Sequence, residues 1–258
     1  MRFGRSLYAI AALVVPGVTW AQARPGMPGM DMGDGGNAAH EAMAGKLIES
    51  AHMRMTPMRP RADADSVRAM AIADTLRRAL AKYSDPAAAE RDGYKLFAPQ
   101  IKNPKTFHYT KWSNALGEAF RFDPAKPTSI LYKKDAQGRT QLQGAMYTMP
   151  KRTSAADLDK RIPLSVTQWH LHTNLCMPAK GQEQRYAELR DGKPVFGLAG
   201  TITTKAACDA KNGRFLDVLF GWMVHANVFE GTDLKSVWGH DEHTEHDDHP
   251  VPAGRPGR

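Results

Sequence analysis

The segment SVTQWHLHTNLC, residues 165–176, constrains the fold more than any other part of the chain, because its side chains alternate in character. Successive side chains of a β-strand point to opposite faces of the sheet. Trp169 and Leu171 would therefore lie on an apolar core face. His170 and His172 would lie on the other face, about 6.5–7 Å apart along the strand. We expect a strand that buries one face and presents two imidazoles on the other.

The segment GWMVHANVFEG, residues 221–231, repeats this division. His225 would share a face with Met223 and Asn227, while Trp222 and the aliphatic side chains lie on the opposite face. If this strand neighbours the first one, His225 joins the other two histidines. His108 is a further candidate, since alternation sets it apart from its aromatic neighbours in TFHY.

These positions predict a transition-metal site formed by His170, His172 and His225, with His108 as an optional fourth ligand. Imidazole nitrogens bind zinc at about 2.0–2.1 Å, and a tetrahedral site takes at least three protein ligands. Nearby amides could orient the ligands, and the candidates are Gln168, Asn174 and Asn227. Two alternatives stay open, namely a hydrogen-bonded polar cavity without metal and an ordinary half-exposed sheet.

Helix signals precede the strands. Asp63 or Asp65 can cap a helix that runs to about residue 84, with an apolar stripe at residues 72, 76, 80 and 83. Asp85 and Pro86 begin a second, short helix that Gly93 ends.

The later segments alternate between strand and short-helix signals. Residues 129–133 and 141–147 predict a hairpin around the turn at 135–138. Short helices are expected near residues 154–162 and 206–212, and a further strand at 220–229. We therefore predict an α+β fold, in which an N-terminal helical segment packs on a mainly antiparallel β-sheet or partly closed barrel.

The N-terminus is typical of a secretory signal peptide, residues 1–23. Arg2 and Arg5 precede a short apolar run, and Ala21-Gln22-Ala23 is a small-x-small cleavage site. We expect a periplasmic or secreted protein without a transmembrane segment. The predicted organisation continues with a Met- and Gly-rich flexible segment (24–60), one α+β domain (61–239) and a disordered His- and acid-rich tail (240–258).

Both flanking segments carry candidate metal ligands. Thioethers select Cu(I), whereas imidazole and carboxylate suit Zn, Cu(II) and Ni. The methionine-rich segment contributes Met27, Met30, Met32, His52, Met53, Met55 and Met58. The tail contributes His240, His243, His246 and His249, which alternate with acidic residues. These clusters predict auxiliary arms that gather metal ions, although a solvated tail and accidental linker methionines are the plainer interpretation.

The chain has two cysteines, Cys176 and Cys208. Export makes a disulfide between them plausible, and a thiolate at a metal site is the alternative. The formal net charge is +8, but the basic residues are scattered and no nucleic-acid motif is present. We therefore expect metal ions rather than nucleic acid as partners.

Several stretches together resemble a family of uncharacterised exported bacterial proteins. The likeness covers about residues 52–230 and rests on PLSVTQWHLHTNLC, LQGAMYTMP, FDPAKPTSILY, HMRMTPMRP and GWMVHANVF. It implies a shared architecture and adds no chemistry. The H-x-H pair also resembles a cupin strand weakly, but Asn174, Leu175 and Cys176 stand where cupins continue with glutamate, so no cupin activity is carried over.

The sequence thus predicts a periplasmic metal-binding protein that serves buffering, delivery or resistance, with copper favoured over zinc. A metal-dependent enzyme is an alternative, because a three-histidine centre with an open position can activate water or dioxygen. Polar groups near such a centre would be Gln168, Asn174, Tyr109 and Glu230. A non-metal envelope binding module is the third hypothesis.

Overall fold

The structure is a computed structural model that describes residues 51–97, 99 and 106–239. The predicted signal peptide, the first methionine cluster and the histidine-rich tail lie outside these residues. Within the described part, no helix combines the length and apolar character that a membrane crossing requires.

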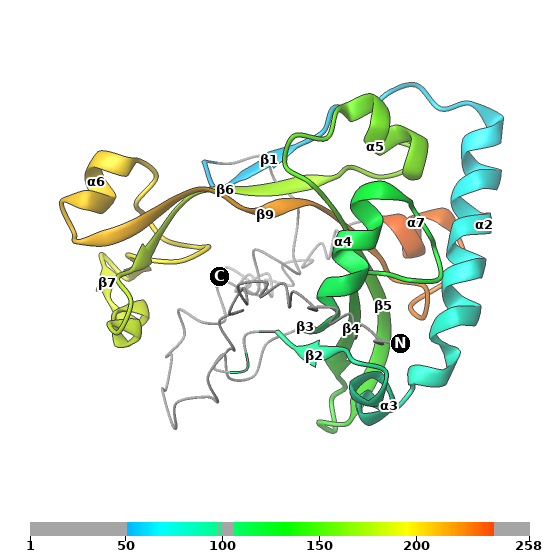
Figure 1. The fold of residues 1–258 in the computed structure, drawn as a ribbon, viewed down its shortest axis with the longest axis horizontal. Helices are drawn as coiled ribbons and strands as arrows, with labels where there is room; N and C mark the ends of the chain where they lie inside the picture. Colours follow the sequence, from blue (N-terminus) through cyan, green and yellow to red (C-terminus); the bar gives the residue numbers. More distant parts are fainter. Residues whose placement is uncertain (1–50, 98, 100–105, 240–258) are drawn as a thin grey trace, which may run out of the picture.

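A seven-stranded antiparallel sheet forms the centre of the fold (Figure 1). Its strand order is β1-β6-β9-β5-β4-β3-β2, and it does not close into a barrel. The strands are β1 (Met53–Met55), β2 (Lys95–Leu96), β3 (Thr106–Thr110), β4 (Ser129–Lys134), β5 (Thr140–Met149), β6 (His170–Pro178) and β9 (Gly213–Ala226). A separate two-stranded ribbon pairs β7 (Leu189–Arg190) with β8 (Lys193–Pro194). The α+β prediction with a mainly antiparallel sheet is confirmed.

Helices flank the sheet on both sides, with α2 and α7 on one side of β5 and α4 on the other (Figure 1). The helical elements are α2 (Asp63–Leu80), η1 (Ala81–Tyr83), α3 (Pro86–Arg91), α4 (Trp112–Phe120), α5 (Ala155–Arg161), η2 (Glu183–Ala187), α6 (Lys205–Asp209) and α7 (Leu234–Trp238). The main core lies between α2 with α7 and one face of the sheet, and it includes Trp169, Leu171, Trp222 and Val224. Trp169 and Trp222 therefore occupy the predicted core face.

Local signals explain most helix boundaries. Asp85 caps α3 through a 3.0 Å bond from the Ala87 amide, and Ser154 caps α5 through the Asp157 amide. The first helix differs in detail from the prediction, because its N-cap is Ala62. Asp65 instead reaches back from inside the helix and accepts a hydrogen bond from the Ala62 amide at 2.9 Å.

Four segments differ from the sequence prediction. Residues 53–55 form the edge strand β1, although they fall in the segment predicted to be flexible, because they pair with β6. Strand β6 begins only at His170, whereas β9 begins at Gly213 and is longer than expected. Helix α4 was not predicted, since its apolar side chains face outward and give no core-facing stripe.

Strand β9 is bent where it crosses β6. His170 pairs with Met223 and His172 with Leu219, so β9 holds two extra residues between these pairs. Phe220 takes a left-handed backbone conformation with φ of 60°, which is uncommon for a bulky residue. The centroid of the Phe220 ring lies 5.6 Å from that of Phe97, which follows β2, and 5.7 Å from that of Trp112 in α4. Phe220 at the bend thus contacts a residue that directly follows β2, the far edge strand.

The sheet is strongly curved. Strands β3 and β9 are separated by β4 and β5, which corresponds to about 14 Å in a flat sheet. The rings of His108 on β3 and His225 on β9 nevertheless lie only 5.9 Å apart. We call the surface on which these two side chains meet the concave face. Gly144 contributes to the close approach of β5 and β9, because a Cβ there would lie 1.9 Å from the carbonyl oxygen of Ala226.

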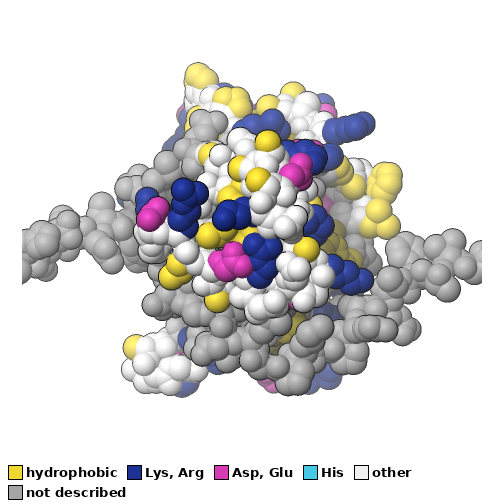
Figure 2. Space-filling model, turned by 90° about the vertical axis from the view of Figure 1, so that its left-hand side faces the viewer, with side chains coloured by type: hydrophobic (Ala, Val, Ile, Leu, Met, Phe, Trp, Pro, Cys, Tyr) yellow, Lys and Arg dark blue, Asp and Glu magenta, His cyan; other side chains and the backbone are white. Residues whose placement is uncertain are grey.

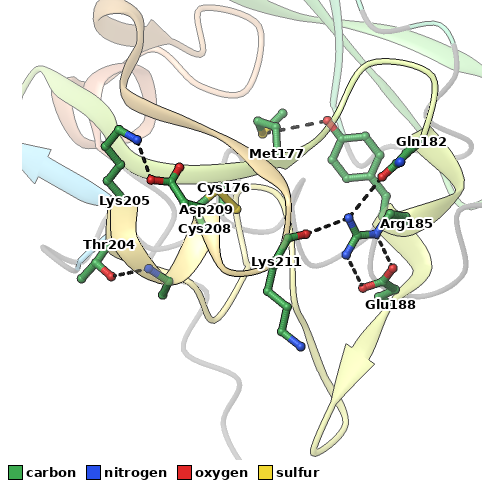
Figure 3. Close-up of a disulfide and its surroundings, with 12 residues drawn as sticks. Cys176, Met177, Gln182, Arg185, Glu188, Thr204, Lys205, Cys208, Asp209 and Lys211 are labelled. Carbon is green, nitrogen blue, oxygen red and sulfur yellow. Dashed lines mark hydrogen bonds and ion pairs between the residues drawn. A yellow bond between two sulfur atoms is a disulfide. The ribbon is translucent and has the colours of Figure 1, made fainter.

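A disulfide between Cys176 and Cys208 ties α6 to the end of β6 (Figure 3). It anchors a small lobe with its own core of Val195, Phe196 and Ile202. The structure thus contains the disulfide that the two cysteines predict, and Cys176 is not available as a thiolate ligand.

Candidate functional site

Four histidines form a row across the concave face. The ring centroids of His172 and His170 are 5.5 Å apart, those of His170 and His225 are 5.4 Å apart, and those of His225 and His108 are 5.9 Å apart. We call this set the histidine row. It brings together all four predicted ligands from three strands, with His170 and His225 in the middle.

Each of the three histidines on β6 and β9 lies opposite a methionine on a neighbouring strand. His170 pairs with Met223 of β9 and with Met55 of β1, because β6 lies between these strands. The other pairs are His172 with Met53 and His225 with Met146. Residues opposite each other in an antiparallel sheet share a face, with Cβ atoms about 4.5–5.5 Å apart. The concave face therefore alternates imidazoles and thioethers.

A small apolar cluster of Leu131, Met146 and Met223 lies among the histidines. Leu131 is the register partner of His108, as Met146 is of His225 and Met223 is of His170. The two thioethers therefore pack together in the middle of the row. Sequence reasoning put Met223 on this face but did not name it as a ligand, and it missed Met146. Alternation within LQGAMYTMP carries the signal for Met146, but its partner strand could not be known from sequence.

The row is largely removed from solvent. His170 is 1% exposed, His172 is 2% exposed and His108 is 6% exposed. Burial, assisted by the nearby charge of His52, lowers the pKa of His172 from 6.5 to about 4. His172 is therefore neutral at pH 7, and a neutral imidazole is the form that binds a metal ion.

Two of the three predicted orienting amides have other roles. Gln168 donates to the carbonyl oxygen of Thr56 at 2.6 Å. Asn174 has a φ of 55°, which interrupts the alternation of β6, and its amide donates to the carbonyl of Ala51 at 2.9 Å. Asn227 is 7% exposed and follows the end of β9.

The remaining polar candidates lie elsewhere. Tyr109 packs on the opposite face of the sheet, with its ring 5.1 Å from that of Tyr132. Glu230 forms an ion pair with Lys133. Neither contact brings these side chains to the histidine row, so the polar groups proposed for an enzyme site do not gather there.

The second methionine group was predicted to be an auxiliary arm, and the structure places two of its members in the sheet. Met53 and Met55 belong to β1, whereas Met58 is 51% exposed beyond it. His52 joins β1 to the disulfide lobe, since its ring nitrogens lie 3.3 Å from the Thr173 carbonyl and 2.5 Å from the Gly200 carbonyl. Met27, Met30, Met32, His240, His243, His246 and His249 lie outside the described residues.

The donor set fits a soft metal ion by its chemistry, although not as a three-histidine cluster. Among residues 51–97, 99 and 106–239, no three histidine, cysteine, aspartate or glutamate side chains form a group that could hold a metal ion. The rings of His172 and His225 lie on either side of that of His170, at interplanar angles of 80° and 79° to it. Histidine–methionine pairs, by contrast, recur along the row, and this pairing of imidazole with thioether suits copper.

The surface does not suggest a polyanion site on the face seen in Figure 2. Lysine and arginine side chains are spread there among polar and apolar atoms, with acidic side chains beside some of them. Near the disulfide, local ion pairs join Arg185 with Glu188 and Lys205 with Asp209 (Figure 3).

Comparison of the chain with protein-family models, with curated proteins and with solved structures finds no match. The function must therefore be argued from the histidine row and its surroundings.

Proposed function

We propose that this protein binds copper on the concave face of its sheet and serves copper buffering, delivery or resistance in the periplasm or outside the cell. His170 and His225 would hold the ion at the centre of the row together with Met223 and Met146. His172 and Met53 offer a neighbouring pair of donors. The metal would be bound as cargo, so no reaction is assigned to it.

The observation that carries this proposal is the register of the sheet. Three strand pairs set a thioether opposite an imidazole, namely β1 with β6, β6 with β9 and β5 with β9. A polar lining that only needed hydrogen bonds would gain nothing from methionine, because a thioether is a weak acceptor.

Copper is favoured over zinc by the same pairing. Thioether ligands select Cu(I), whereas structural zinc sites use thiolate, imidazole and carboxylate. The two cysteines are joined in a disulfide, so thiolate is excluded as a donor in the described part of the chain. The low pKa of His172 supports binding as well, since no proton must leave that imidazole at neutral pH.

Competition titration tests the proposal. The protein is the full chain with His240, His243, His246 and His249 replaced by alanine and Met27, Met30 and Met32 replaced by leucine, so that neither predicted arm competes for the ion. Cu(I) is supplied anaerobically as its acetonitrile complex against bathocuproine, and Zn(II) is titrated separately. We expect one Cu(I) site that His170→Ala weakens by roughly 10-fold or more, which corresponds to about 1.4 kcal/mol. Thr173→Ala is the control, because Thr173 lies on the same strand as His170 and His172 but its hydroxyl donates to the Ala51 carbonyl outside the row.

Equal Cu(I) binding by the His170→Ala variant would overturn the proposal. The non-metal binding module, in which the histidines only line a polar surface, would then take its place. Tighter binding of Zn(II) than of Cu(I) would refute the preference for copper. The metal-dependent enzyme stays a prediction.

A further inference from the structure

Helix α4 exposes apolar side chains and buries a charged one, whereas an ordinary surface helix does the reverse. It exposes Trp112, Leu116 and Phe120, which are 59%, 66% and 82% accessible to solvent. Its one fully buried side chain is the carboxylate of Glu118, which is 2% exposed. A buried carboxylate is costly unless it is paired or hydrogen-bonded, so its surroundings need an explanation.

Only one of the two carboxylate oxygens is used. Oε2 of Glu118 accepts hydrogen bonds from the Thr128 hydroxyl at 2.6 Å and from the Thr148 amide at 2.7 Å. Oε1 is also buried but has no hydrogen-bond partner in the described part of the chain. Burial raises the pKa of this carboxyl from 4.5 to about 7. Oε2 thus fixes the side chain to Thr128, just before β4, and to Thr148 of β5, while Oε1 can accept a hydrogen bond from a ligand.

Glu118 lines a cavity of about 470 Å³ on this flank of α4. This volume is within the range of small-molecule sites. The wall consists of Ser113, Asn114, Gly117, Glu118, Arg121, Asp123 and Lys126. Asn114 is held in place, since its amide donates to the Tyr94 hydroxyl and to the Pro127 carbonyl, both at 3.0 Å.

The wall offers a ligand one cation, Arg121, and the buried carboxyl of Glu118. Lys126 and Asp123 form an ion pair at 3.4 Å and offset each other. Arg121 is exposed and has no ion pair within the part of the chain that the structure describes. Arg121 follows the last residue of α4 with an extended backbone, and it lines the same cavity as Glu118.

From this arrangement we infer that the cavity binds a small zwitterion of the amino-acid class, with its ammonium group on Oε1 of Glu118 and its carboxylate on the guanidinium of Arg121. An ammonium group donates the hydrogen bond that Oε1 lacks, and it compensates the buried charge. A guanidinium is suited to bidentate binding of a carboxylate. This site is separate from the proposed copper site and does not depend on it.

Binding of free amino acids to the full chain tests the inference. Each of the proteinogenic L-amino acids is screened by thermal shift, and the best one is measured by calorimetry. Propionate and ethylamine, which carry only one of the two charges, are the reference ligands. We expect an amino acid that binds at least roughly 10-fold more tightly than either reference, and a loss of roughly 10- to 100-fold in Glu118→Gln and in Arg121→Ala.

Two matched variants remove the same charges from exposed positions outside the cavity, namely Glu90→Gln and Arg78→Ala. Both should bind like the unmodified chain. If Glu118→Gln does not fold, Arg121→Ala alone decides. The inference is overturned if no amino acid binds more tightly than propionate and ethylamine, or if Arg121→Ala binds as tightly as Arg78→Ala.

Discussion

His170 of β6 lies directly opposite Met223 of β9, at the point where β9 bends around the end of β6. The imidazole is 1% exposed and the thioether side 5% exposed. The bulge beside this pair and the curvature of the sheet set the pair in the centre of the histidine row, between His172 and His225. Variants of these two residues therefore test most directly whether the histidine row binds a metal ion.

Replacing Met223 by leucine should weaken Cu(I) binding by roughly 10-fold while leaving Zn(II) affinity unchanged, because leucine keeps the volume but lacks the sulfur. Met146→Leu should act in the same direction. Met149→Leu is the matched control, since Met149 lies on β5 but packs in the main core on the other face of the sheet. Chelator competition gives the affinities. Equal Cu(I) affinities of the Met146 and Met149 variants would argue against thioether ligation.

The stability of the protein should depend on pH through His172. Its pKa is about 4 in the folded state against 6.5 for the free side chain, so the unfolded state binds more protons between these values. Stability is therefore lost as the pH falls from about 6.5 to about 4, by up to about 3 kcal/mol.

Urea unfolding at a series of pH values measures this loss. His172→Gln should show a smaller decrease of the unfolding free energy over the same interval, because glutamine does not titrate. Parallel curves for the two proteins would mean that His172 does not contribute.

Gly144→Ala should destabilise the fold by about 2 kcal/mol or more. The new Cβ would lie 1.9 Å from the Ala226 carbonyl oxygen and 2.9 Å from the Asn227 Cα, and backbone atoms cannot rotate away. Gly117→Ala is the control, because nothing lies within 4 Å of its Cβ position and alanine favours a helix, by about 0.5–1 kcal/mol. Thermal and chemical unfolding report both effects. A Gly144→Ala variant as stable as the parent would show that β5 and β9 can separate without cost.

Removal of the disulfide by Cys176→Ser with Cys208→Ser should cost about 3–4 kcal/mol on the chain-entropy estimate for a sequence separation of 32 residues. The loss should be concentrated in the lobe of α6, η2 and the β7–β8 ribbon, where hydrogen exchange should accelerate. Copper affinity should not change, since the bond lies beyond the histidine row. Thiol titration of the unfolded, unreduced parent should detect no reactive cysteine, and two reactive thiols would refute the bond.

The sequence alone determined those features that depend on near neighbours in the chain. Alternation placed His170 and His172 on one face and Trp169 on the other, and the β4–β5 hairpin follows from the turn between its strands. Asp85 and Ser154 marked helix starts correctly, because a cap needs only an amide two or three residues away.

The tertiary structure decided which strands are neighbours and how far the sheet curves. No local pattern predicts that Met53 pairs with His172 across more than a hundred residues, or that His108 reaches His225 over two intervening strands. These contacts depend on the bend at Phe220, on the close approach at Gly144 and on packing of the opposite face against α2 and α7. Side-chain period is a property of one strand, whereas register and curvature are set by packing between distant segments. The sequence therefore named the four histidines, and only the folded sheet arranged them in a row with methionines between them.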